Sequence, residues 1–236
     1  MKEIISGVYM LCGPLGAGIL STNIYLLADD DITIVDSGFT GRTKQVLNAV
    51  RSLGYTSSDV KRIIITHHHP DHVGSLLELR DSTGADVIAH PLDVPYIDGR
   101  LRQPRTENMG WRSALLKLSE KLWRITPVTV TETVDDGDEL PGGIKILHTP
   151  GHTQGSICIY MESKRLVIAG DLLVNRFGLK LPSRAFTVDM YREAHSLQKL
   201  AEMEFDIVCF GHGRPLVKNA RASVTDFACR VNARFT

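Results

Sequence analysis

The stretch Thr66-His67-His68-His69-Pro70-Asp71-His72 places five side chains that can bind metal within six residues. It follows directly on the apolar run Ile63-Ile64-Ile65, so the pattern His-x-His-x-Asp-His would begin where a strand ends. Imidazole and carboxylate groups suit zinc and the neighbouring divalent transition metals. The spacing favours a site for two metal ions over a histidine-rich surface loop that binds metal adventitiously.

Three further polar residues repeat one arrangement, in which a potential ligand lies beside glycine just after an apolar run. They are His152 in Pro150-Gly151-His152-Thr153, Asp171 after Gly170, and His212 in Gly211-His212-Gly213. A glycine next to a ligand lets the backbone turn sharply and approach closely. A strand end gives the rigid placement that metal geometry demands. Each motif alone is a weak signal, whereas their order after the histidine motif is a strong one.

Together the four motifs resemble those of the metallo-β-lactamase-fold hydrolase superfamily, in its glyoxalase II and lactonase-like branch. The resemblance runs from about Ile4 to Gly213. It implies an α/β fold, the αββα sandwich, with two mixed β-sheets flanked by helices and the metals at one edge.

The resemblance also implies a set of ligands for two divalent metal ions. The first metal would be held by His67, His69 and His152, the second by Asp71, His72 and His212, and Asp171 would bridge them. Asp36, which ends the run Thr33-Ile34-Val35-Asp36, would accept a hydrogen bond from a ligand histidine and fix its tautomer. Zinc is the metal expected first, with iron or manganese also possible, because these metals share such ligands.

The chemistry expected of such a site is hydrolysis by a metal-bound hydroxide, since bound metals lower the pKa of water towards neutrality. Asp71 and Asp171 would be the catalytic carboxylates, with Asp71 orienting the nucleophile or passing a proton to the leaving group. The expected substrate is a small, partly apolar carboxylic ester, lactone or thioester. Its pocket would be lined by Phe177, Leu179, Leu181, Phe186 and Trp111.

Departures from the known branches narrow this expectation. True metallo-β-lactamases do not use aspartate at the position of Asp171, and only 65 residues follow it, fewer than the helical C-terminal part of glyoxalase II requires. Acyl-homoserine lactonases commonly have tyrosine where this chain has Val174. Two further activities stay open: a persulfide dioxygenase with one iron on His67, His152 and Asp171, and a phosphoester hydrolase. A binding protein without catalysis is disfavoured because the ligand set is intact.

The segments between the motifs alternate between strand-like and helical patterns. Strands are expected at 4–10, 23–28, 32–35, 62–66, 87–90, 128–134, 144–148, 156–161, 166–169 and 206–210, and helices at 40–53, 73–81, 111–123, 190–203 and 222–231. Residues 91–127 could form a helical cap, and residues 175–188 a partly apolar loop. No linker is evident, so residues 1–236 are expected to form a single domain.

Composition limits the partners. The chain has 27 basic residues (Lys plus Arg) and 27 acidic residues (Asp plus Glu), so it has no excess of positive charge that would indicate nucleic-acid binding. The four cysteines are scattered, and no run approaches eighteen apolar residues. The expectation is a cytoplasmic enzyme with a small-molecule substrate and with neither nucleic acid nor membrane as partner. A homo-oligomer is left open.

Overall fold

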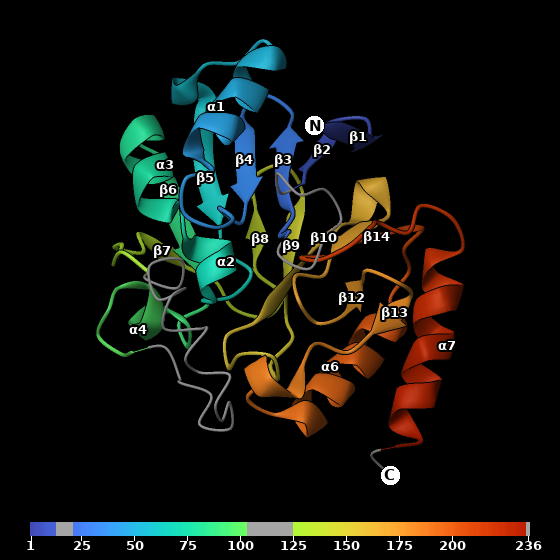
Figure 1. Ribbon diagram of the computed structural model, residues 1–236. Coiled ribbons are helices and arrows are strands. Elements are labelled where there is room, and N and C mark those ends of the chain that lie inside the picture. The colour runs from blue at the N-terminus through green and yellow to red at the C-terminus, as the bar shows by residue number, and fades with distance from the viewer. Residues whose placement is uncertain (13–20, 103–124, 235–236) are drawn as a thin grey trace.

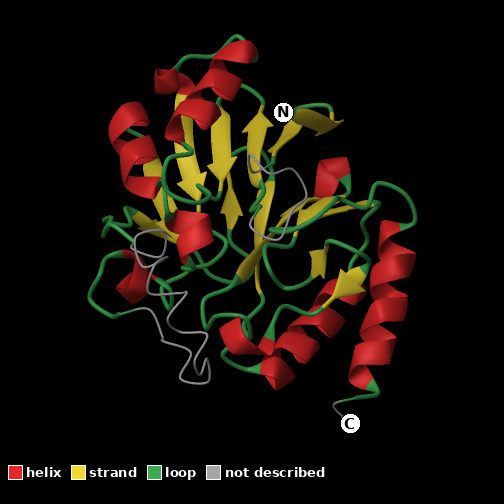
Figure 2. Cartoon of the chain, in the orientation of Figure 1, coloured by secondary structure: helices red, strands yellow, loops and turns green. Residues whose placement is uncertain are grey.

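Two β-sheets pack face to face, and helices cover the outer face of each sheet (Figure 1 and Figure 2). The computed structural model describes residues 1–12, 21–102 and 125–234. Both sheets mix parallel and antiparallel strands. The αββα sandwich predicted from the motifs is therefore confirmed.

The first sheet has seven strands among the described residues. Their order is β1 (Lys2–Ile5), β2 (Val8–Leu11), β3 (Ile24–Ala28), β4 (Ile32–Val35), β5 (Val60–Ile64), β6 (Asp86–Ala89) and β7 (Glu132–Thr133). Strands β4 to β7 run parallel. Helices α1 (Thr43–Ser52) and α3 (Leu76–Thr83) cover the outer face, α1 through Val46, Ala49 and Val50 at helical spacing.

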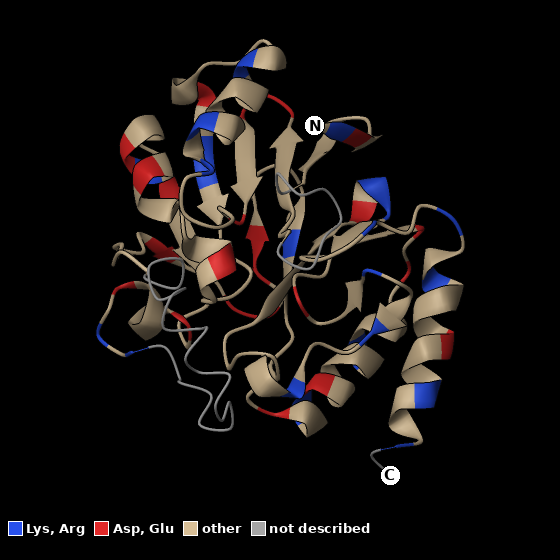
Figure 3. Ribbon diagram, in the orientation of Figure 1, with Lys and Arg blue, Asp and Glu red and all other residues tan. Residues whose placement is uncertain are grey.

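The second sheet has five strands among the described residues, in the order β14 (Ile207–Cys209), β11 (Leu166–Ile168), β10 (Ile157–Met161), β9 (Ile144–His148) and β8 (Glu139–Leu140). Its outer face packs against helices α6 (Met190–Ala201) and α7 (Ala220–Asn232). Acidic and basic side chains alternate along these two helices (Figure 3). A small hairpin of β12 (Val174–Asn175) and β13 (Leu179–Lys180) lies nearby (Figure 1).

An apolar layer between the two sheets fixes how they pack on each other. Val35, Ile64 and Ile88 of the first sheet share a buried cluster with Ile146 and Ile159 of the second. Each such side chain contributes roughly 1.5–3 kcal/mol when it is fully buried. As a result, the carboxyl end of β5 faces the loops of the second sheet that carry the other motifs.

Several predicted boundaries were wrong for local reasons. Residues 4–10 form the β1–β2 hairpin rather than one strand, because Gly7 turns the chain at a φ of 77°. The helix predicted at 73–81 is two helices, α2 (Pro70–Val73) and α3, separated at Gly74. Gly74 lies so close to Phe39 that a Cβ there would meet its carbonyl carbon at 2.7 Å. The strand predicted at 128–134 is reduced to β7.

The remaining described elements are short. They are α4 (Val94–Ile97) and the 3₁₀ helices η1 (Ser57–Asp59), η2 (Glu162–Lys164) and η3 (Arg184–Phe186). The predicted loop 175–188 thus contains β13 and η3. The predicted helix 111–123 lies outside the described residues, as does most of the predicted cap. Within the described ranges, no helix is both long and apolar enough to cross a membrane.

Candidate metal centre

All four motifs meet at one edge of the sandwich. The histidine motif follows β5, and the loops that carry His152, Asp171 and His212 follow β9, β11 and β14. Potential ligand atoms lie within 4.8 Å of one another in three overlapping groups: His67, His69 and His152; His67, His72 and Asp171; and Asp71, His72 and His212. The structure thus brings together all seven residues predicted as ligands.

Hydrogen bonds to Nδ1 fix the orientation of the histidine rings. His72 Nδ1 lies 2.8 Å from a carboxylate oxygen of Asp36, and His212 Nδ1 lies 2.9 Å from the carbonyl oxygen of Ser21. Neither oxygen can donate, so both rings donate from Nδ1. His72 Nε2 is buried without a partner in the described protein. An Nε2 atom left in this state is suited to bind metal.

The rings of His67 and His152 show the same arrangement through hydroxyl groups. The Thr66 hydroxyl donates to Asp36 at 2.8 Å, so it accepts from His67 Nδ1 at 3.1 Å. His152 Nδ1 lies 3.2 Å from the Thr187 hydroxyl. The Nε2 atoms of His67 and His152 are likewise buried without partners.

Asp36 therefore lies directly behind the candidate ligands. Besides contacting His72, its carboxylate accepts the backbone N–H and the hydroxyl of Thr66. Its φ of 62° is in the left-handed region, which aspartate tolerates better than most residues. The backbone conformation turns this carboxylate from the end of β4 towards the histidine motif.

Two carboxylates lie among the imidazoles. Asp171 Oδ2 is 3.1 Å from His212 Nε2 and 3.6 Å from His152 Nε2, and its Oδ1 is 3.7 Å from His72 Nε2. Asp71 Oδ2 is 3.1 Å from His212 Nε2 and accepts the Thr22 hydroxyl at 2.9 Å. Asp171 thus lies close to His152, predicted to bind the first metal, and to His72 and His212, predicted to bind the second, as a bridging ligand must.

The charges of the centre divide it in two. Burial disfavours ionisation of Asp71 and Asp171, but His72 and His212 outweigh this effect and hold both carboxyl pKa values well below normal. Burial also opposes protonation of His72, yet the carboxylates of Asp36, Asp71 and Asp171 raise its pKa to about 9. In the metal-free protein, His72 and His212 are therefore protonated, and their positive charges balance the neighbouring carboxylates as bound metal ions would.

The other group of histidines is neutral. Burial and the neighbouring imidazoles lower the pKa values of His67 and His69 well below normal. Burial likewise lowers the pKa of His152, to about 4. Neutral imidazoles are the form that binds metal.

The residues predicted to line a substrate pocket lie in different environments. Phe177 is 85% exposed, and Phe186 is 37% exposed. Leu179 and Leu181 are partly buried against the core between the second sheet and its helices. Trp111 lies outside the described residues.

A further cluster of His90, Asp135 and His148 is less suited to metal. The two rings stack 3.9 Å apart at 16°, so their nitrogen lone pairs lie in nearly parallel planes and do not converge. The Leu92 N–H donates to His90 Nδ1 at 3.2 Å, and His148 Nε2 faces the carbonyl of Gln154 at 2.9 Å.

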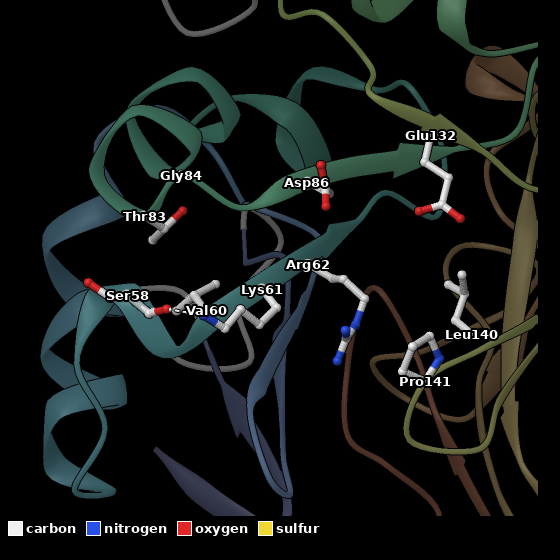
Figure 4. Close-up of a pocket in the computed structure, with 10 residues that line it drawn as sticks. All are labelled: Ser58, Val60, Lys61, Arg62, Thr83, Gly84, Asp86, Glu132, Leu140 and Pro141. Carbon is white, nitrogen blue, oxygen red and sulfur yellow. Dashed lines mark hydrogen bonds between the residues drawn. The ribbon is translucent and has the colours of Figure 1, made fainter.

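A surface hollow of about 410 Å³ lies away from this chemistry (Figure 4). Its lining includes Val60, Lys61 and Arg62 at the start of β5 and Asp86 at the start of β6. The histidine motif instead follows the end of β5. The hollow and the candidate centre therefore lie at opposite ends of strand β5.

Sequence reasoning identified Asp36 but missed the other residues that hold the ligands in place. Ser21, Thr22 and Thr187 contact ligand side chains, and the buried Asp93 binds the backbone beside them. The one available signal was the position of Asp93, four residues after the end of β6.

Gly211 makes the centre sensitive to one added methyl group. A Cβ there would collide with Asp171 Oδ1 and lie 2.8 Å from His72 Cε1. We expect Gly211→Ala to displace Asp171 and lower the zinc content of the purified protein by half or more. The measurement is elemental analysis together with the melting temperature.

Gly84→Ala is the control for this substitution. Gly84 has a φ of 72°, so alanine strains the backbone there, but nothing lies within 4 Å of its added Cβ. An unchanged zinc content in Gly211→Ala would contradict the position of Asp171 described above.

Comparison with known proteins gives a consistent result. The sequence model described as "Metallo-beta-lactamase superfamily" matches residues 17–212. "Probable metallo-hydrolase YflN" of Bacillus subtilis is 26% identical over 94% of this chain and 92% of its own. "Hydroxyacylglutathione hydrolase" of Rhizobium etli is 28% identical over 87% of this chain and 71% of its own.

Solved structures show the same fold. A metallo-beta-lactamase family protein from Thermus thermophilus superposes with a TM-score of 0.73 at 26% identity, covering 98% of this chain and 81% of that one. A protein solved in a di-iron-bound form gives a TM-score of 0.70 at 24% identity, covering 93% and 99%.

Proposed function

The chain belongs to the metallo-beta-lactamase superfamily, and we propose that it is a metal-dependent hydrolase with two divalent metal ions. Its substrate would be a carboxylic ester, lactone or thioester of a small, partly apolar molecule. His67, His69 and His152 would bind the first metal, Asp71, His72 and His212 the second, and Asp171 would bridge them.

The observation that carries this proposal is the set of buried Nε2 atoms of His67, His72 and His152, which have no hydrogen-bond partner in the described protein. Buried polar atoms without partners are uncommon, because each costs about 1–3 kcal/mol. Asp171 Oδ1 is buried without a hydrogen-bond partner in the same place. Nitrogen and oxygen donors of this kind fit zinc and its neighbours.

The bound metals would supply a nucleophile at neutral pH by lowering the pKa of water, and they would polarise the acyl oxygen. The residues of the chain would hold and move protons around them. Asp71 is ionised at neutral pH because its pKa is well below normal, and the Thr22 hydroxyl fixes one of its oxygens. A carboxylate of such low pKa is a weak base, so Asp71 would act by accepting a hydrogen bond from the attacking water and orienting it.

Relatives inform the substrate and the metal. Hydroxyacylglutathione hydrolase is among the curated relatives, which supports a thioester or a related acyl compound. Zinc is proposed first, and the di-iron-bound neighbour keeps iron as a second possibility. All four cysteines are free thiols, which supports action in the reducing cytoplasm. The equal numbers of basic and acidic residues, 27 each, support a small-molecule substrate rather than nucleic acid.

A single-iron persulfide dioxygenase is the second candidate. The Nε2 atoms of His67 and His152 are buried without hydrogen-bond partners in the described protein, and Asp171 Oδ2 lies 3.6 Å from His152 Nε2. These three side chains could therefore hold one iron.

Elemental analysis of the purified protein tests these proposals. We expect about two zinc ions per chain, as two-metal sites of this kind hold, with hydrolysis of members of an ester, lactone and thioester panel that includes a phosphodiester. About one iron per chain, with oxygen uptake on glutathione persulfide, would replace the hydrolase by the dioxygenase. Cleavage of the phosphodiester alone would make the chain a phosphoester hydrolase. Protein without metal that cannot be reconstituted would contradict every catalytic proposal.

A further inference from the structure

We propose that Asp93 is a positioning residue for the first metal, because its carboxylate ties together the two loops that carry His67, His69 and His152. This inference rests on the metal centre proposed above. Asp93 follows β6 and is 1% exposed. It contacts none of the candidate ligand side chains directly, so its effect would pass through the backbone.

The contacts of Asp93 reach both loops at once. Its Oδ2 accepts the backbone N–H of His68 at 2.8 Å and the hydroxyl of Thr153 at 2.8 Å. Its Oδ1 accepts the backbone N–H of Gly155 at 2.8 Å. His68 belongs to the loop after β5 in the first sheet, whereas Thr153 and Gly155 belong to the loop between β9 and β10 in the second.

These three donors are neighbours of the ligands in the chain. His68 lies between His67 and His69, and Thr153 follows His152. The ring centroids of His67 and His69 lie 4.7 and 4.6 Å from that of His152, although the loops come from different sheets. Asp93 is the side chain that joins the two backbones beside these rings.

The surroundings of Asp93 keep it in place. Asp93 is the N-cap residue of α4, and its backbone carbonyl accepts hydrogen bonds from the N–H groups of Tyr96 and Ile97 in that helix. The His68 ring stacks on Tyr96, with centroids 4.2 Å apart at 21°. A Cβ on Gly155 would lie 2.6 Å from Asp93 Oδ1, so glycine at this position permits the close approach.

The chemistry of Asp93 suits a residue that positions the two ligand loops better than one that stabilises the fold. No ion pair to Asp93 is found among the described residues. A buried carboxylate without a cation carries a desolvation cost that its hydrogen bonds must offset. The Asp93 carboxylate does, however, offer two acceptor oxygens to its three donors. A hydroxyl or an amide oxygen would accept these three hydrogen bonds less well.

The two carboxylate supports would then differ in reach. Asp93 holds the backbone beside the ligands of the first site, whereas Asp36 accepts the Nδ1–H of His72 in the second site and also reaches His67 of the first through the Thr66 hydroxyl. Loss of a support of this kind weakens metal binding by about 10- to 100-fold. A loss confined to one site separates positioning from a general effect on folding.

The experiment measures zinc affinity in proteins that keep one site each. His212→Ala keeps the first site, and His69→Ala keeps the second. Asp93→Ala is added to each background, and zinc affinity is measured by competition with a chromophoric chelator. We expect affinity to fall by about 10- to 100-fold in the His212→Ala background and to change less than twofold in the His69→Ala background.

Three further variants keep the test interpretable. Asp93→Asn retains the volume and loses one acceptor, so it serves if the alanine variant fails to fold and is expected to give a smaller loss. Thr153→Val removes one contact and keeps the shape. Asp59→Ala is the matched control, because Asp59 also accepts a backbone N–H and a hydroxyl, both from Thr56.

The outcomes separate this inference from the proposed function. Unchanged affinity in the His212→Ala background, or an equal loss in both backgrounds, would overturn the role of Asp93. Failure of the wild-type chain itself to bind zinc would instead overturn the metal centre.

Discussion

Asp171→Ala is expected to lower kcat/KM by roughly a thousandfold, because a lost metal-bridging ligand removes several kcal/mol of transition-state stabilisation. Asp171 is the one candidate ligand whose oxygens lie within 3.7 Å of His72, His152 and His212 among the described ion pairs. Its loss should therefore affect both metals. The measurement is kcat/KM on the best substrate of the panel, together with metal content.

Two comparisons sharpen this result. Asp171→Asn keeps the size and removes the charge, and we expect it to lose at least one metal per chain. Asp59→Ala removes a partly exposed, hydrogen-bonded aspartate at the far end of β5 and should leave both readouts unchanged. Full activity with two metals in Asp171→Ala would exclude Asp171 from the centre.

Removal of the metals is expected to lower the melting temperature by roughly 10 °C. A ligand at a thousand times its Kd stabilises the folded state by about 4 kcal/mol. In a chain of this length each kcal/mol shifts the melting temperature by roughly 2–4 °C. The measurement is thermal unfolding with and without a chelator.

The metal-free protein should also lose stability as the pH rises. His72 has a pKa of about 9 in the folded protein, above its ordinary value of 6.5. Its stabilising contribution, roughly 3 kcal/mol, is therefore complete below pH 6.5 and disappears as the pH rises through about 9. His212, whose pKa is also raised, acts in the same direction.

The carboxylates do not alter this window. Asp71 and Asp171 have lowered pKa values, so their contributions are present at neutral pH and are lost only in acid. Metal takes the place of the protons, so the loaded protein should not show the decline between pH 6.5 and 9. A metal-free protein whose stability stays flat or increases over this range would contradict the proton arrangement.

The sequence predicted the centre better than the elements around it. Each ligand motif stands after an apolar run, but it was the resemblance of the motifs to those of the superfamily that grouped His67, His152 and His212 in advance. The short β7 and the division between α2 and α3 could not be predicted, because they depend on contacts such as that of Gly74 with Phe39.

Apart from Asp36, the residues that support the ligands could not be predicted from the sequence. Asp93 bonds to Thr153, sixty residues away, and Ser21 accepts from His212 across 191 residues. A lone aspartate or serine in a loop gives no local pattern that would indicate such a partner. These pairs become visible only when the two sheets are packed together.

The segment after η3 helps to hold the candidate ligand His152 in place. Thr187 contacts the His152 ring, and the N–H of Val188 donates to the His152 carbonyl, while neighbouring Phe186 and Val188 are exposed. If Phe186 lines the substrate pocket as predicted from the sequence, an exchange of the neighbouring Thr187 that reshapes this pocket would also disturb the His152 ring. Other loops could then change the substrate range without this effect on a candidate ligand.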